Sequence, residues 1–237
     1  GMNPGIADAI GLSWRLAAIH AGWGGDRILD DYATERRSVS EATSQAARDI
    51  DGYLHELARD PELHRDTPAG AELRARTGRL IEEQDRKQWF SQGVQFGARY
   101  VGSPGLAEDG DGADDVAAIN RIDEYVPSVR PGSRLPHVWR PDGRSVFDEL
   151  GQGFTLLQVG ADAPDTDELH HAAEELGIPL TVLRLPEEDA VAVYRRRLVL
   201  VRPDWYVAWS SDSMPEDAAG LLTALTGSPR LVATAAS

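Results

Sequence analysis

The residues with the clearest potential for ligand chemistry stand at the start of the sequence, where Asn3 and Pro4 precede a repeating apolar pattern. Asn is a preferred helix N-cap and Pro is preferred in the first helical turn, so the pair predicts a helix that begins here. The first N–H groups of a helix have no partner within it and carry a partial positive charge. Such an end can stabilise negative charge on a bound group. The side chain of Asn3 can cap the helix at the same time, because capping and ligand contact use different atoms.

Three other groups of residues suggest chemistry, but each has the wrong spacing or context. The acidic segment Glu108–Asp115 fails as a calcium loop, because Gly112 does not fall at the required sixth position. His170 and His171 are adjacent on an expected helix and point apart, which argues against a shared metal. Gly151–Gly153 precedes an expected strand, whereas the glycines of a dinucleotide fingerprint follow one. We therefore predict no metal site and no dinucleotide-binding turn.

Composition excludes several functional classes. The chain has 237 residues, of which 41% are hydrophobic and 27% charged, as in ordinary globular proteins. It contains no cysteine, which excludes disulfides and thiol chemistry, and no apolar run near the roughly 20 residues that span a bilayer. Without a secretory signal pattern, we expect a cytoplasmic protein. The net charge is −15, of which residues 101–237 carry −12 (23 acids, 11 bases), so nucleic acid is not an expected partner.

The first 90 residues are expected to be almost wholly helical. Apolar residues recur at steps of three and four from Ile6 to Trp23, and glycines end this helix. A second helix is expected over about 26–58, and a third opens at Asp66-Thr67-Pro68 and reaches about Trp89.

The C-terminal part of the sequence alternates strand and helix patterns. Strands are expected over 154–159 and 180–185, a hairpin over 198–202 and 206–210, and helices over 166–176, 187–195 and 215–225. The order β-α-β-α-β-β-α is that of a thioredoxin-like domain whose first two strands are parallel. Because cysteine is absent, we expect a redox-inert domain that shares the scaffold alone. The predicted fold class is α/β, with a helical segment over 1–104, an acidic linker over 105–130 and the thioredoxin-like domain over 131–237.

Six stretches of the sequence form an ordered series of motifs. The first is Gly1–Ala17, which begins Gly-Met-Asn-Pro-Gly-Ile-Ala-Asp-Ala, and the second is Leu29–Arg37. The others are Gln95–Tyr100 with Ser103-Pro104, Pro131–Trp139, Gly153–Leu157 and Leu200–Trp209. Together they resemble the class A flavoprotein aromatic hydroxylases, which include phenol and polyketide hydroxylases. Departures are Gly11 for Asn, Arg15 for Lys and Ser38 for Pro.

The resemblance implies the C-terminal part of an FAD-dependent monooxygenase that hydroxylates electron-rich rings and uses NAD(P)H as co-substrate. In the family, backbone amides at the positions of Met2 and Asn3 contact the flavin edge that becomes negative on reduction. The dinucleotide fingerprint, the acid that binds the ribityl chain and most of the substrate pocket have no counterpart in this sequence. We therefore expect the isolated chain to be inactive and free of FAD until an N-terminal flavin domain joins it, and we assign no catalytic residue.

Assembly expectations follow from the same resemblance. Leu12, Leu16 and Ile19 of the first helix would pack against a sheet that this chain lacks, so we expect a homodimer through the first two helices. The alternative to an enzyme portion is a non-catalytic assembly or dimerisation module with a redox-inert thioredoxin-like fold. His137 could line an interface with the flavin domain or form a structural turn, and both interpretations stay open. Arg195–Arg197 is interpreted as a solvated helix end.

Overall fold

The chain folds into two compact units. The computed structural model describes residues 2–57, 60–100, 102–107 and 122–227. Within these, the first unit combines residues 2–37, 99–107 and 127–227, and the second combines residues 38–98 and 122–126. The start of the chain therefore belongs to the same unit as its C-terminal half.

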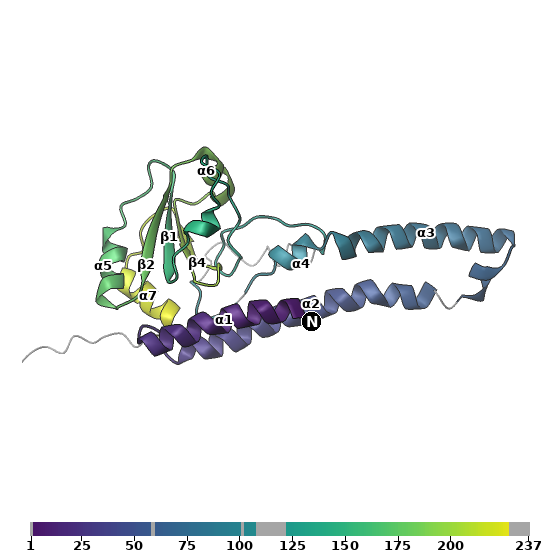
Figure 1. The fold of residues 1–237 in the computed structure, drawn as a ribbon, viewed down its shortest axis with the longest axis horizontal. Helices are drawn as coiled ribbons and strands as arrows, with labels where there is room; N and C mark the ends of the chain where they lie inside the picture. The colour runs from purple at the N-terminus through teal and green to yellow at the C-terminus, as the bar shows by residue number, and fades with distance from the viewer. Residues whose placement is uncertain (1, 58–59, 101, 108–121, 228–237) are drawn as a thin grey trace, which may run out of the picture. The chain divides into compact units, whose positions relative to one another are not determined.

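Helix α1 (Met2–Ala21) and the first part of α2 (Arg27–Leu57) open the first unit (Figure 1). Both expected helices are confirmed. Gly22 follows α1 with a φ of +85°, a left-handed conformation that Gly adopts without steric cost. Because α1 begins at Met2, Asn3 lies inside its first turn and not at the cap position. Helix ends inferred from residue preferences commonly differ by one or two positions in this way.

The second unit is helical. After the remainder of α2 it contains the 3-10 turn η1 (Pro61–His64), α3 (Pro68–Trp89) and α4 (Gln92–Phe96). The hydroxyl of Thr67 caps α3 by accepting a hydrogen bond of 2.9 Å from the backbone N–H of Gly70. This cap, with proline in the first turn, explains why the third expected helix begins where the sequence indicated.

A four-stranded mixed sheet forms the centre of the first unit. Its strands are β1 (Phe154–Val159), β2 (Leu180–Leu185), β3 (Leu198–Val201) and β4 (Val207–Ser211). The strand order is β2-β1-β3-β4, with β1 parallel to β2 and antiparallel to β3, which is itself antiparallel to β4. All six residues of β1 are buried, which accounts for its unbroken apolar sequence.

Helices cover both faces of this sheet. Helices α5 (Asp167–Glu175) and α7 (Ala218–Thr226) pack with one face, and α6 (Glu188–Tyr194) and the turn η3 (Val146–Glu149) pack with the other (Figure 1). Side chains alternate along each strand, so Phe154 and Leu156 join the α5–α7 side. The β-α-β-α-β-β-α order and the sheet topology confirm the predicted thioredoxin-like α/β fold, and its strands carry no cysteine.

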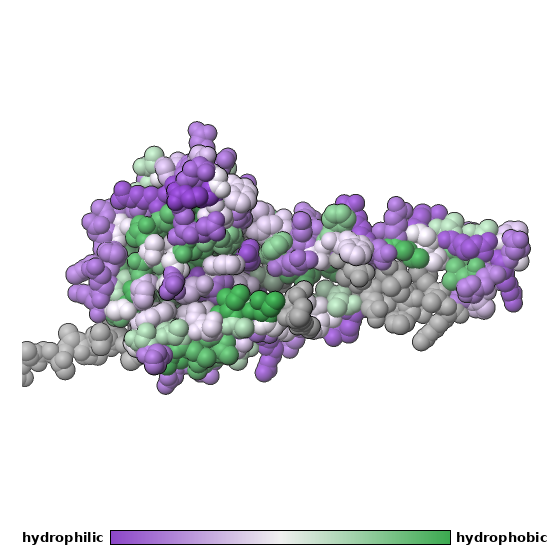
Figure 2. All heavy atoms as spheres, viewed as in Figure 1, coloured by the Kyte–Doolittle hydropathy of each residue, from purple (hydrophilic) through white to green (hydrophobic). Residues whose placement is uncertain are grey.

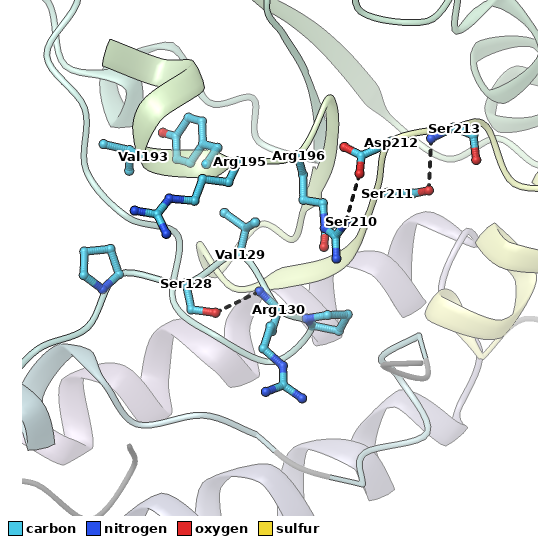
Figure 3. A pocket seen from close by; sticks show the side chains of 13 residues that line it. Ser128, Val129, Arg130, Val193, Arg195, Arg196, Ser210, Ser211, Asp212 and Ser213 are labelled. Carbon is cyan, nitrogen blue, oxygen red and sulfur yellow. Dashed lines mark hydrogen bonds and ion pairs between the residues drawn. The ribbon is translucent and has the colours of Figure 1, made fainter. Parts of the chain in front are cut away.

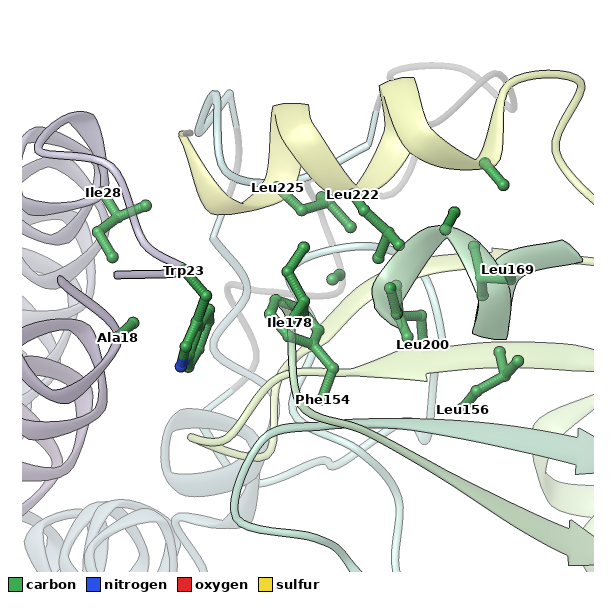
Figure 4. Packing of buried hydrophobic residues seen from close by; sticks show 14 of the residues in the cluster. Ala18, Trp23, Ile28, Phe154, Leu156, Leu169, Ile178, Leu200, Leu222 and Leu225 are labelled. Carbon is green, nitrogen blue, oxygen red and sulfur yellow. The ribbon is translucent and has the colours of Figure 1, made fainter. Parts of the chain in front are cut away.

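The core on the α5–α7 side of the sheet extends to α1. Figure 4 shows Ala18, Trp23 and Ile28 beside Phe154 and the side chains of α7. The Trp23 ring lies edge-on to the Phe154 ring with centroids 6.1 Å apart and stacks on the Trp14 ring at 6.2 Å. One face of α1 is therefore part of the thioredoxin-like core.

This packing supplies a partner for one part of the apolar stripe of the first helix, which was expected to lack one. Ile19 packs against the core, whereas Leu16 is half-exposed. The buried face instead runs through Trp14, Arg15 and Ala18. The hydrophobic pattern does not predict this buried face, because it contains Arg15 and a charged residue is expected at the surface.

We expect Trp23→Ala to lower the free energy of unfolding of the first unit by about 3–5 kcal/mol, because it removes a large ring from a packed core. Trp89→Ala is the matched control, since Trp89 is 78% exposed in the second unit and its loss should change stability by less than about 0.5 kcal/mol. Urea denaturation monitored by circular dichroism measures both. Equal, small effects of the two substitutions would show that Trp23, which follows α1, does not pack on this core.

Candidate functional site

A buried network of charges joins α1, α2 and the turn between β3 and β4. Arg15 comes from α1, Glu35 from α2, and Arg202 and Asp204 from the turn, and each is at most 6% exposed. Glu35 lies at its centre. Its carboxylate accepts hydrogen bonds from Arg15 Nη2 at 2.7 Å and from the two Nη atoms of Arg202 at 2.8 and 2.9 Å.

The charges of this network are balanced. Arg202 also pairs with Asp204 at 2.8 Å, so two guanidinium groups face two carboxylates. Burial by itself would raise the pKa of Glu35, but the positive charge of Arg202, its hydrogen bonds, and the contacts with Arg15 and Ser103 outweigh it and lower that pKa to about 2. Burial likewise opposes the charge on Arg202, but Asp204 and Glu35 overcome this and raise its pKa well above the ordinary value. A set in which each charged group faces an opposite charge tolerates burial better than a lone charge does, and here the Nε atom of Arg15 is the buried donor left without a hydrogen bond.

Aromatic rings enclose the two arginines. The Arg202 guanidinium carbon lies 5.6 Å from the Trp14 ring centroid and 5.5 Å from that of Tyr100. The Arg15 guanidinium lies 4.7 Å from the Trp14 centroid. These contacts exclude water from the network and add cation–π attraction, which strengthens when the cation is desolvated.

A second chain of contacts starts nearer the N-terminal end of α1. Arg36 donates from Nε to Asp8 at 2.7 Å and from Nη1 to the Tyr100 hydroxyl at 2.8 Å. The Tyr100 ring stacks on Tyr206 with centroids 4.2 Å apart. The early turns of α1 are therefore fixed to the β3–β4 turn.

The predicted ligand contacts, Met2 and Asn3, lie in the first turn of α1. This turn contains no acidic residue. Asp8, further along the helix, has its carboxylate engaged by Arg36. The helix end is therefore suited to negative charge on a bound group.

Two surface cavities lie on the first unit. One of about 520 Å³ is lined by Arg130, Arg195 and Arg196, together with Asp212 and the serines at positions 128, 210, 211 and 213 (Figure 3). Arg196 pairs with Asp212 at 2.9 Å, and Arg195 donates to a carbonyl of the last turn of α6 at 3.2 Å. Arg195 therefore serves as the cap of α6, which fits its interpretation as a helix end. The other cavity, of about 820 Å³, lies beside the end of β1 and the start of α5.

Among the residues that the structure describes, no group of three or more His, Asp or Glu side chains is placed to hold a metal ion. His170 faces Glu174 at 3.5 Å and His171 faces Glu175 at 3.3 Å, so the two histidines have separate partners. The acidic segment Glu108–Asp115 of the expected linker lies outside the described residues. Among the described helices, none is long and apolar enough to cross a bilayer.

Comparison with known families agrees with this arrangement. A sequence model described as aromatic-ring hydroxylase, C-terminal, matches residues 128–229, and one described as FAD binding domain matches residues 1–47. The chain belongs to the flavin-dependent aromatic-ring hydroxylases. The two matched segments are those that the buried network joins.

Related proteins carry flavin monooxygenase names. An FAD-dependent monooxygenase, apdD, of Emericella nidulans is 36% identical; the match covers 90% of this chain and 35% of the relative. The 4-methyl-5-nitrocatechol 5-monooxygenase of a Burkholderia species is 34% identical over 94% of this chain and 39% of the relative. The solved structure of the rebeccamycin biosynthetic enzyme RebC with reduced flavin superposes with a TM-score of 0.82 at 33% identity, covering 97% of this chain and 42% of that one. The chain thus spans about two fifths of the length of these relatives.

The network residues lie within the sequence motifs, but the motifs assign them no role. Arg15, Glu35 and the Arg202–Asp204 pair lie within three of the six motifs. The one feature of the sequence that indicates a buried role is that these charged residues lie among apolar residues of the motifs. Their partners could not be assigned, because the sequence places Glu35 and Arg202 167 positions apart.

We expect Glu35→Gln to destabilise the first unit by about 3–5 kcal/mol, because it leaves two buried guanidinium groups without their central anion. The pKa of Glu35 is lower in the folded protein, so its ionised form stabilises the fold above its ordinary value of 4.5. This stabilisation should be lost as the pH falls from about 4.5 to about 2. Denaturant unfolding across that pH range measures it.

The control is Glu82→Gln on exposed surface of α3, which should keep the pH dependence and the stability of the wild type. A Glu35→Gln protein that unfolds at the same denaturant concentration as the control would contradict the central place of this carboxylate.

Proposed function

We propose that the chain is the C-terminal portion of an FAD-dependent monooxygenase that acts on an aromatic or polyketide substrate. The observation that carries this proposal is the contact network that fixes α1, whose first turn bears Met2 and Asn3, to the thioredoxin-like domain. In this proposal, residues 1–104 continue a flavin-binding domain, residues 105–130 form a linker and residues 131–237 form the C-terminal domain.

The first turn of α1 fits the flavin edge that becomes negative on reduction. The backbone N–H groups of Met2 and Asn3 are among the first four of the helix and have no acceptor within it. No first-turn acid repels an anion there. When bound, FAD would supply the redox chemistry, with NAD(P)H as reductant. The role of this chain is to stabilise negative charge through those two amides.

The isolated chain is proposed to be inactive. A single helix end contributes roughly 0.3–1 kcal/mol per interaction at an exposed site. Retention of a cofactor as large as FAD needs on the order of 10 kcal/mol, so most of the binding energy must come from a flavin-binding region. Such a region is the proposed principal partner, as the greater length of the relatives supports.

A non-catalytic assembly module is the second candidate function, and a specific surface favours it. Ile6, Ile10 and Leu16 of α1 are 42–56% exposed, and hydrophobic surface gathers over α1 in Figure 2. We propose that a flavin-binding region covers this face in the complete enzyme. In the isolated chain, a second copy would cover it and form a two-fold dimer through α1 and α2.

We expect FAD to bind the isolated chain with no submicromolar affinity, as measured by titrating FAD fluorescence. Fusion behind the flavin-binding region of the Emericella nidulans relative, in place of the matching part of that relative, should restore tight binding. In this fusion protein Asn3→Pro removes one backbone donor and should weaken FAD binding about tenfold, the effect of one charge-assisted hydrogen bond.

Asn3→Ala is the control, because it alters the side chain and keeps the backbone N–H. Its FAD affinity should stay within about twofold of the unsubstituted fusion. Equal affinities for the Pro and Ala variants would exclude a backbone contact at this position. Stoichiometric, submicromolar FAD binding by the isolated chain would overturn the proposal that its site is incomplete.

For the dimer, we expect light scattering of the isolated chain at micromolar concentration to give twice the monomer mass. Ile10→Glu should give a monomer, because it places a charge in the apolar contact. Ile81→Glu, at a partly exposed position of α3 in the second unit, should leave the dimer intact. A monomeric wild-type chain would exclude self-association through α1.

A further inference from the structure

A cluster of aromatic and basic side chains lies on the surface of the first unit. It consists of Arg134, His137, Trp139, Phe147 and Trp205, and is called here the aromatic cluster. The ring centroids of His137 and Trp139 are 4.5 Å apart, those of His137 and Phe147 5.7 Å, and those of Phe147 and Trp205 5.1 Å. The Arg134 guanidinium lies 4.9 Å from the Phe147 centroid and 5.7 Å from that of Trp205.

Trp205 occupies a backbone conformation that side chains other than Gly avoid. Its φ is +69°, and its N–H closes the β3–β4 turn on the carbonyl of Arg202 at 3.0 Å. The left-handed position of such a three-residue hairpin turn normally carries Gly. A bulky residue there is an outlier, and such strain is concentrated at sites where the side chain has a role in binding.

The packing of Trp205 within its own domain does not account for its strained backbone, because the side chain is only partly buried there. Trp205 is 39% exposed, and Trp139, at the other end of the cluster, is 64% exposed. The two indole rings are held in place by neighbouring rings and by a guanidinium group. Anchor residues of protein interfaces are held in the same way, and Trp and Arg are enriched among them.

The contacts of Tyr206 indicate which partner reaches the aromatic cluster. Tyr206 follows Trp205 and stacks on Tyr100. The hydroxyl of Tyr100 accepts a hydrogen bond from Arg36, which also pairs with Asp8 of α1. The cluster is thus fixed within one unit to the N-terminal half of α1, beside which a flavin-binding region must lie under the proposed function. The relatives have such additional length, because this chain spans 35–42% of them.

We propose that the aromatic cluster is a docking surface for the flavin-binding region, with Trp205 and Trp139 as its anchors. The partner surface presents an apolar recess for the two indole rings. This inference rests on the proposed function, but it adds a contact surface on the thioredoxin-like domain to the flavin contact at α1.

Two measurements test the inference. In the isolated chain, Trp205→Gly removes the strained conformation, so its Tm should equal or exceed that of the wild type. In the fusion with the flavin-binding region of the Emericella nidulans relative, Trp205→Gly and Trp139→Ala should each release FAD at least tenfold faster. Trp89→Ala, which removes an exposed tryptophan from the second unit, should leave the release rate unchanged.

The outcomes separate this inference from the proposed function. A fusion that retains no FAD would overturn both. A fusion that retains FAD equally with and without the two substitutions would overturn the docking surface alone. A Trp205→Gly chain with a clearly lower Tm would show that Trp205 serves internal packing. Loss of dimerisation in isolated Trp139→Ala or Trp205→Gly chains, with Ile10→Glu still dimeric, would assign the cluster to contact with a second copy.

Discussion

The carboxylate of Glu35 lies between two buried guanidinium groups, and the geometry of the first unit depends on that placement. Removing an ion from water costs several kcal/mol, which is recovered when every charged atom finds a partner at short distance. Here Arg202 and Glu35 meet this condition, and Arg15 meets it except at its Nε atom, when α1, α2 and the β3–β4 turn occupy one relative position. The apolar contact of Trp23 with Phe154 stabilises the packing of the helices on the sheet, and the ion network fixes their relative position.

The sheet of the thioredoxin-like domain could be predicted from sequence almost to the residue. Strands β1 and β2 begin and end where the apolar runs do, and the glycine after α7 adopts the left-handed conformation typical of a helix end. These features are local: each depends on side-chain type, spacing and backbone preference within a few residues. The location of Met2 and Asn3 at a helix N-terminus depends on local residue preferences in the same way, so the sequence predicts it equally well.

The contacts that position this helix end could not be predicted in the same way. Hydrophobic patterns treat Arg15 and Glu35 as solvent-facing, so the stripe through Leu16 looked like the buried face of α1, although Leu16 is half-exposed. Pairing between distant charges depends on the folded arrangement of the elements that carry them. Trp205 is a related case, because no residue preference predicts tryptophan in a left-handed turn position.

The separation of Glu35 and Arg202 along the chain also has a consequence for synthesis on the ribosome. Their contact closes a loop of 167 residues. At roughly 5–20 residues per second, on the order of ten to thirty seconds pass between the emergence of Glu35 and that of its principal partner. During this interval α1 and α2 have neither their central ion pair nor the sheet on which Trp23 packs. Completion of the first unit therefore waits until the β3–β4 turn has emerged, and until then α1 and α2 are exposed to chaperones and proteases.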